Sequence, residues 1–208
     1  MHLFLLFSWI VLFPRAYTLK CNECITDITG KCNTYEQCPS ETDQCVVLGM
    51  FTYVGTVVTG GVSLKSCASA HLCINGSLNT GRTRQVITSK CCNTDLCNDQ
   101  LPPEPVAPRP NGKKCFTCDK FGDCIWNLDC VDNEDYCFSA AVDSAGQEMT
   151  RKGCTTTDLC LKAGKTELLE NIAVEVSCCQ GDYCNGAGST GGSLLFLVVT
   201  VVSMVIPS

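Results

Sequence analysis

The chain has 208 residues, of which 20 are cysteines, and its formal net charge is −6. This density of cysteine is typical of secreted disulfide scaffolds. The negative charge argues against nucleic acid as a partner, because binding to phosphates requires clustered positive charge. The chain has only two histidines, His2 and His71, which leaves little material for hydrolytic triads or histidine-rich metal sites. We therefore expect a protein that is not an enzyme and that carries no metal and no cofactor.

An apolar run from Leu3 to Phe13 opens the chain, and small residues follow it at Ala16 and Thr18. This pattern is typical of a signal peptide that is cleaved after Thr18. The alternative is a membrane span, for which the run falls short of the roughly 20 apolar residues required. We expect residues 1–18 to be a signal peptide.

Strand-forming residues dominate the next part of the chain. Gln44–Val58 is rich in Val, Phe, Tyr and Thr, Thr59–Gly61 predicts a turn, and Val62–Ser66 predicts the returning strand. A further strand is predicted at Val86–Thr88.

The first strand of this hairpin has no charged residue between Val46 and Val58. An isolated finger that is apolar on both faces predicts a contact surface, since it cannot bury both sides. We expect its tip residues to bind a protein partner, and the alternative is that one face packs on the second half of the chain. The candidate partner-binding residues are Met50, Phe51, Tyr53 and Val54.

Two further features of the first half concern modification and catalysis. Asn75–Ser77 is a sequon that predicts a glycan on Asn75. His71 would be the one histidine left after removal of the signal peptide, and we interpret it as a surface residue rather than a catalytic base.

Residues 101–112 hold five of the eight prolines and predict a semi-rigid linker. Beyond the linker the strand pattern recurs. Strands are expected at Tyr136–Val142, Glu148–Lys152 and Ile172–Val176, with a turn at Ser144–Gly146.

The second half of the chain is acidic, with 13 acidic and 7 basic residues between Lys113 and Asn185. Asp129, Asp132, Glu134 and Asp135 form its densest cluster. We interpret this cluster as a solvated acidic face. The alternatives are steering of a basic ligand and a calcium site, although the spacing fits no EF-hand.

The C-terminus resembles a signal for glycosylphosphatidylinositol (GPI) attachment. Small residues at Asn185–Ala187 precede a polar spacer at Gly188–Ser193 and a final apolar run at Leu194–Ile206. The alternative, a short tail anchor, would need a longer run to cross the hydrocarbon. The pattern predicts lipidation at Asn185, with Gly186 as the alternative, and loss of residues 186–208.

The cysteines reveal an internal repeat. Each half carries ten of them, and seven of the nine spacings between successive cysteines agree, including the final CC-x4-CN. The even counts and the secretory signal predict five disulfides in each half, although spacing alone leaves roughly a thousand pairings per half. The C-x2-C pairs at Cys21–Cys24 and Cys115–Cys118 also occur in zinc and redox motifs, but reduced thiolates are not expected outside the cell.

The opening Leu19-Lys20-Cys21-x2-Cys24, the ten-cysteine ladder and the closing Cys91-Cys92-x4-Cys97-Asn98 resemble the lymphocyte-antigen-6/urokinase-receptor family of three-finger (LU) domains. The gamma-type phospholipase inhibitors are a related secreted branch. The resemblance implies an all-β, small disulfide-rich fold of two tandem three-finger domains joined by a Pro-rich linker. It also implies that the asparagine after the last cysteine, Asn98 or Asn185, bonds back into the disulfide hub.

The resemblance further implies a pairing of the cysteines by rank. In the first module it gives Cys21–Cys45, Cys24–Cys32, Cys38–Cys67, Cys73–Cys91 and Cys92–Cys97. In the second module it gives Cys115–Cys137, Cys118–Cys124, Cys130–Cys154, Cys160–Cys178 and Cys179–Cys184.

These expectations define the organisation and function that the sequence predicts. The chain would comprise a signal peptide (1–18), a first LU domain (19–100), a linker (101–112), a second LU domain (113–185) and a GPI-attachment propeptide (186–208). Its function would be to bind an extracellular or cell-surface protein from the outer face of the plasma membrane. The alternative is a secreted two-module inhibitor of an extracellular enzyme such as a phospholipase.

Overall fold

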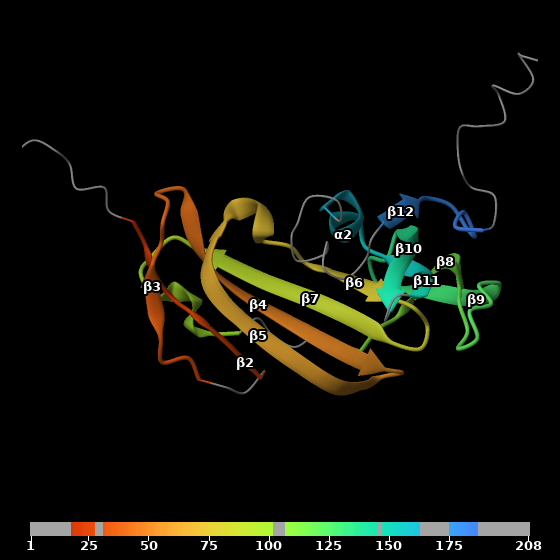
Figure 1. Ribbon diagram of the computed structural model, residues 1–208, viewed down its shortest axis with the longest axis horizontal. Helices are drawn as coiled ribbons and strands as arrows, with labels where there is room; N and C mark the ends of the chain where they lie inside the picture. The colour runs from red at the N-terminus through yellow and green to blue at the C-terminus, as the bar shows by residue number, and fades with distance from the viewer. Residues whose placement is uncertain (1–17, 28–30, 102–106, 145–146, 163–174, 187–208) are drawn as a thin grey trace, which may run out of the picture. The chain divides into compact units, whose positions relative to one another are not determined.

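The computed structural model describes residues 18–27, 31–101, 107–144, 147–162 and 175–186 (Figure 1). The described residues fold mainly into β-strands, which confirms the expected all-β, disulfide-rich class. The expected signal peptide up to residue 17 and the apolar C-terminal run lie outside the described residues. No helix in the described part of the chain is long and apolar enough to cross a membrane.

The chain forms two compact units, whose composition differs from the two modules expected from the sequence. One unit comprises the residues up to Asn75 together with Gln85–Ala107, and the other comprises Gly76–Arg84 together with the residues from Pro108 onward. The segment Gly76–Arg84 therefore belongs to the second unit, although it precedes the linker in the sequence.

The first unit is built from antiparallel hairpins. Strands β4 and β5 form its longest hairpin, β2 pairs with the outer edge of β5, and β1 pairs with β3 in a separate ribbon. The elements of this unit are β1 (Lys20–Asn22), β2 (Cys24–Asp27), β3 (Tyr35–Gln37), β4 (Asp43–Val54), β5 (Val57–Ser69), the 3-10 turn η1 (Ala70–Leu72), β7 (Arg84–Cys92, all but its first residue) and η2 (Cys97–Asp99).

The turn of the long hairpin lies earlier than the sequence predicted. Val54 pairs with Val57, so the turn is Gly55-Thr56, and Gly55 adopts a φ of +61° that favours glycine. Gly60 and Gly61 instead lie within β5, where they pair with Thr52 and Phe51. The predicted turn at Thr59–Gly61 is therefore wrong, because a Gly pair inside an extended strand resembles a turn signal in sequence.

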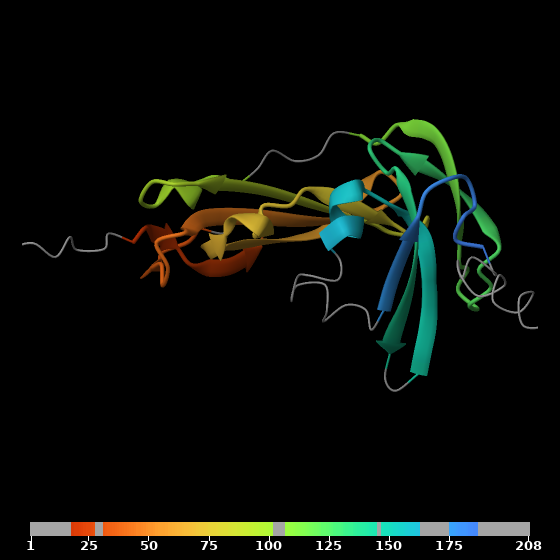
Figure 2. The same ribbon diagram turned by 90° about the horizontal axis from the view of Figure 1, so that it is seen from above.

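The second unit contains two sheets. Strands β8 and β9, drawn in green, form one hairpin (Figure 2). In the other sheet the strands of this unit have the order β12-β10-β11-β6. Its elements are β6 (Gly76–Asn79), β8 (Pro110–Thr117), β9 (Trp126–Val131), β10 (Tyr136–Ser144), β11 (Gln147–Thr155), the short helix α2 (Thr157–Lys162) and β12 (Glu175–Cys179).

Cystines form the core of each unit. The first unit buries three cysteines together: Cys21, Cys38 and Cys45. The second unit buries four together: Cys115, Cys130, Cys137 and Cys154. The structure has ten disulfides, which join the cysteines in the rank order given above. Because small domains bury little apolar surface, such cross-links supply much of their stability.

One buried asparagine closes each hub. In the first unit Asn98 Nδ2 donates to the carbonyls of Val46 (2.8 Å) and Asn22 (3.0 Å), and Asn98 Oδ1 accepts from Asn22 N–H. In the second unit Asn185 Nδ2 donates to the carbonyls of Phe116 and Phe138, both at 2.9 Å. Each amide therefore ties the C-terminal end of its module to two strands that begin far earlier in the chain.

Candidate binding surface

The long β4–β5 hairpin does not expose both faces. Phe51 and Tyr53 are only 3% and 4% exposed and pack in one cluster with Val86 of β7 and Val58. The structure therefore does not expose Phe51 and Tyr53 as the expected partner-binding tip, because both rings are buried beside Val86 of β7, the strand next to β4 in the sheet. On the opposite face Met50 is half-buried, and Val54 at the turn is 50% exposed.

The predicted acidic cluster is also not a free acidic face. Glu134 is fully buried, and its Oε1 accepts from Arg84 Nε at 2.8 Å and from Ser77 Oγ at 2.7 Å. Asp132 accepts from Arg84 Nη2 at 2.9 Å. Asp135 and Asp129 pair with Lys113 and Lys114.

Arg84 and Ser77 belong to the Gly76–Arg84 segment, so this ion cluster holds that segment within the second unit. Asn79 Nδ2 donates to the other oxygen of Glu134 at 3.0 Å, and β6 pairs with β11 through Asn79 and Leu78. No local sequence pattern indicates this role, because Arg84 and Glu134 lie 50 positions apart in the chain.

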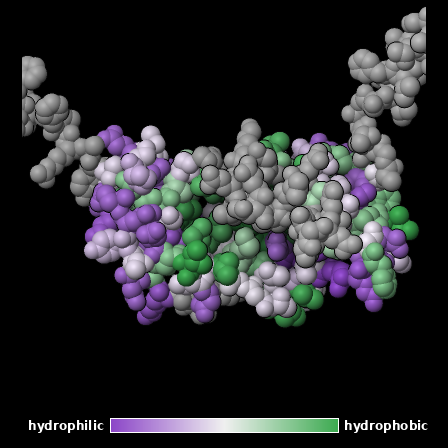
Figure 3. All heavy atoms as spheres, viewed as in Figure 1, coloured by the Kyte–Doolittle hydropathy of each residue, from purple (hydrophilic) through white to green (hydrophobic). Residues whose placement is uncertain are grey.

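A different loop of the second unit exposes large apolar side chains. Phe121, Ile125 and Trp126 are 80%, 74% and 57% exposed, and all three lie in the connection from β8 to the start of β9. We name the residues from Cys118 to Trp126 the apolar loop. Figure 3 shows hydrophobic atoms at the end of this unit where Figure 1 labels β8 and β9. This surface was not expected from the sequence, because three apolar residues in a short polar connection have no strand periodicity.

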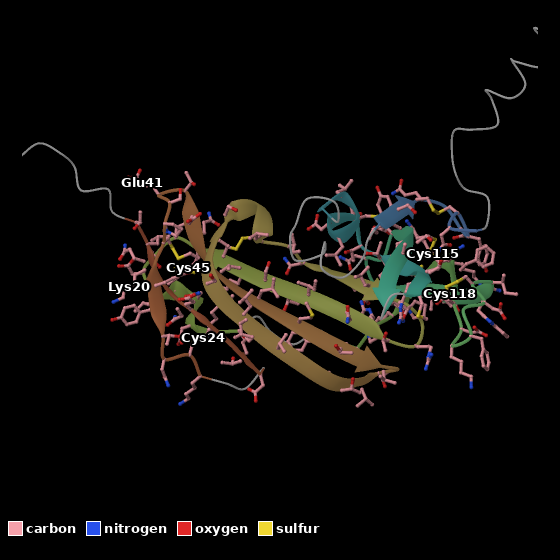
Figure 4. The ribbon with its side chains drawn as sticks, viewed as in Figure 1. Lys20, Cys24, Glu41, Cys45, Cys115 and Cys118 are labelled. Carbon is pink, nitrogen blue, oxygen red and sulfur yellow. A yellow bond between two sulfur atoms is a disulfide. The ribbon has the colours of Figure 1, made fainter. Side chains whose placement is uncertain are left out.

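The apolar loop has a fixed backbone. The Cys118–Cys124 disulfide closes it. Cys118 directly follows β8, the strand that contains the hub cysteine Cys115 (Figure 4). Asp119 N–H donates to the carbonyl of Asp123 at 2.9 Å, and Asp119 Oδ1 accepts from the N–H groups of Phe121 (2.8 Å) and Asp123 (3.0 Å). The exposed side chains therefore stand on a backbone that is already ordered before any partner binds.

These bonds also act on the Asp119 carboxyl. Desolvation raises the pKa of Asp119, but hydrogen bonds from Asp123, Phe121, Gly122 and the Trp126 side chain outweigh it and hold the pKa below its ordinary value. The carboxylate therefore serves as an internal acceptor for the loop.

A hollow lies beside the apolar loop. A shallow part of about 360 Å³ is lined by the Thr80–Arg82 turn, by residues of the loop and by Trp126, and a smaller part of about 80 Å³ extends towards β11. Thr117 Oγ1 fixes its floor by hydrogen bonding to the carbonyls of Thr80 (2.7 Å) and Lys152 (3.2 Å).

The predicted glycosylation site is sterically open. Asn75 is exposed, and its Oδ1 accepts from Ser89 N–H at 2.7 Å, which leaves Nδ2, the atom that carries an N-linked sugar, out of this bond. The side chain of His71 lies outside the described residues.

The predicted lipidation residue has a structural role. Asn185 is buried in the hub, and its backbone carbonyl accepts from Lys152 Nζ at 2.6 Å. Gly186 N–H donates to the carbonyl of Tyr183, so the Asn185–Gly186 bond lies inside a hydrogen-bonded turn.

Two clusters of three cysteine sulfurs, one at each hub, have the proximity of a metal site. They are Cys21, Cys38 and Cys67 in the first unit and Cys115, Cys130 and Cys154 in the second. All six sulfurs are engaged in disulfides, and metal binding by cysteine requires the thiolate.

Comparison with known families matches both modules. Residues 17–100 match the u-PAR/Ly-6 domain, and residues 114–185 match the family of snake toxins and toxin-like proteins. The chain belongs to the u-PAR/Ly-6 (LU) superfamily. Its two LU domains are mostly β and carry the ten disulfides described above.

The relatives of this LU protein include receptors and inhibitors. The urokinase plasminogen activator surface receptor of Bos taurus is 29% identical over 46% of this chain, which spans only 32% of that receptor. A phospholipase A2 inhibitor of the gamma type from Elaphe quadrivirgata is 29% identical over 65% of this chain and 74% of the inhibitor. Ly6/PLAUR domain-containing protein 6 of Rattus norvegicus is 32% identical over 38% of this chain and 52% of its own length.

Proposed function

We propose that this LU protein is a non-catalytic cell-surface protein that is held by a GPI lipid and binds an extracellular protein partner. One observation carries the proposal of binding: Phe121, Ile125 and Trp126 are exposed together on a loop that a disulfide and Asp119 hold in place. Large exposed apolar groups in a soluble domain mark interaction sites, and a pre-ordered loop loses little conformational entropy on binding.

The proposed tether is supported by the C-terminal sequence pattern. We assign the lipid to Gly186 rather than Asn185, because attachment at Asn185 would require cleavage of the Asn185–Gly186 bond, which lies in the hub turn. Mass spectrometry of the C-terminal peptide of the mature protein tests this assignment. A lipid-bearing peptide that ends at Asn185 would contradict it.

The test of function uses the full chain with an epitope tag placed after Thr18, expressed on cultured cells. Phosphatidylinositol-specific phospholipase C should release the surface signal into the medium. The released protein is then screened for binding to a panel of extracellular domains. A domain that binds the wild-type protein should no longer bind a variant that combines Phe121→Ser and Trp126→Ser. Ile25→Ser with Val62→Ser, at two exposed apolar residues of the other unit, is the matched control and should leave this binding unchanged.

A second candidate function is inhibition of a secreted enzyme. It is favoured by the similarity to the snake phospholipase A2 inhibitor, of which this chain covers 74%. Protein found free in the medium before phospholipase C treatment, together with inhibition of a secreted phospholipase A2 by that protein, would select this function over the first.

A further inference from the structure

The hollow beside the apolar loop is lined mainly by basic residues, although the second module is acidic. Arg82, Lys120, Arg151 and Lys152 line it, against one acidic residue, Asp119. Three of the seven basic residues between Lys113 and Asn185 thus lie at one place in a module that has 13 acidic residues. The hollow is therefore a basic site on an acidic module.

The cations of this site are available to a ligand. Arg82, Lys120 and Arg151 are exposed, and they form no ion pair with any other residue that the structure describes. Lys120 Nζ lies 4.7 Å from the centre of the Phe121 ring. Lys152 is different, because its Nζ donates to the carbonyl of Asn185.

The one acidic group at the site does not cancel this charge fully. Asp119 Oδ1 already accepts two backbone N–H groups of its own loop, and the Trp126 side chain bonds to the same carboxyl. Its negative charge therefore faces donors inside the loop, while the guanidinium groups of Arg82 and Arg151 are left to pair with an external carboxylate.

The same hollow also has an apolar side. Trp126 lines its shallow part, and Phe121 and Ile125 extend the apolar surface from the same loop. An aromatic or aliphatic side chain packs well on such a surface, and carboxylates on either side of it would pair with arginine in a bidentate manner.

From this geometry we propose that the hollow binds an acidic segment of the protein partner, in which Asp or Glu residues flank an aromatic or large aliphatic anchor. The anchor contacts Trp126 and the apolar loop, and the carboxylates pair with Arg82 and Arg151. This inference rests on the proposed function and names the chemistry of the partner.

The test uses residues 19–186, in which Trp126 is the single tryptophan, since the other is Trp9. The probe is a displayed library of random peptides of about twelve residues, long enough to contain an anchor with its flanks. Peptides selected on the wild-type protein should be enriched in Asp and Glu next to aromatic residues. A tryptophan-free member of the selected set should change the emission of Trp126 on binding.

Two variants test the contacts. The double variant Arg82→Glu with Arg151→Glu should lower the affinity for the selected peptide by about tenfold or more. Trp126→Ser alone should lower it by a similar factor. Lys90→Glu, an exposed cation of β7, and Val57→Ser are the controls and should leave its affinity unchanged. All of these side chains except Trp126 are free of described ion pairs and hydrogen bonds, and thermal unfolding of each variant checks that it folds.

The possible failures are distinguishable. Selected peptides that are basic, or acidic peptides that bind the double arginine variant equally well, would overturn the acidic-segment proposal. Tighter binding of heparin fragments or of vesicles with phosphatidylserine than of any peptide, lost in the same variants, would replace it with a polyanion or lipid site. If the selected peptides bind the Trp126→Ser variant as tightly as the wild-type protein, the apolar loop is not the binding surface and the proposed function loses its support as well.

Discussion

Arg84 Nε donates to Glu134 Oε1 at 2.8 Å, and this bond joins two residues that are 50 positions apart in the chain. The Glu134 side chain is fully buried and that of Arg84 is 9% exposed. A buried ion pair is costly to break from one side, because the remaining charge has no water to solvate it.

Replacement of Glu134 by alanine should therefore lower the free energy of unfolding by about 3–5 kcal/mol. Chemical denaturation of the secreted protein measures this change. Asp135→Asn removes one partner of the exposed Lys113–Asp135 pair and should cost only about 0–1 kcal/mol. Equal losses for the two variants would show that the Glu134 cluster contributes no more than a surface pair.

The β4–β5 hairpin provides a second prediction, about its buried face. Phe51→Ala should lower the free energy of unfolding by about 3–5 kcal/mol, because it empties the cluster that Phe51 forms with Tyr53 and Val86. Val54→Ala, at the exposed turn, should change it by less than about 0.5 kcal/mol. Denaturant melts of both variants test this difference, and a stable Phe51→Ala protein would contradict the burial.

The hub asparagines provide a third prediction. Asn185→Ala should leave Phe116 and Phe138 with buried backbone groups that lack partners, at about 1–3 kcal/mol for each group. Asn98→Ala should lower the free energy of unfolding in the same way in the first unit, where it removes the bonds to Asn22 and Val46. Asn127→Ala, on the exposed side of β9, is the control and should be near neutral. Normal stability of Asn185→Ala would remove the hub role that we assign to it.

Asp119 gives a prediction about pH. Because its pKa is lower in the folded protein than its ordinary value of 3.8, the ionised form contributes loop stability above that value. This contribution is lost as the pH falls through the lowered pKa. The emission of Trp126 should hold steady from neutral pH down to about pH 4 and change below it. Asp119→Asn should remove this transition, whereas Asp123→Asn should retain it.

The sequon residues Asn75 and Ser77 should differ in their effect on stability. Asn75→Asp and Ser77→Ala should both abolish the glycan, seen as loss of the mass shift on treatment with a glycosidase. Only Ser77→Ala should also lower the free energy of unfolding, by about 1–3 kcal/mol, because Ser77 Oγ donates to buried Glu134. Asn75→Asp keeps the oxygen that accepts from Ser89. Stable, fully glycosylated Asn75→Asp protein would refute the assignment of Asn75.

The sequence by itself determined the repeat, the disulfide-rich class and the positions of most strands. Cysteine spacing and the alternation of β-forming residues are local properties, so Tyr136–Val142 and Val86–Thr88 could be assigned as strands without any knowledge of their neighbours. The superfamily also followed from these spacings.

Tertiary structure decided which residues are exposed. Phe51 and Phe121 are the same residue type, yet Phe51 is buried beside Tyr53 and Val86, whereas Phe121 is 80% exposed. Glu134 and Asp129 are both acidic residues of one cluster, but only Glu134 receives Arg84 from a strand 50 residues away. Burial depends on which strands become neighbours in space, and this is set by long-range pairing that composition and periodicity do not encode.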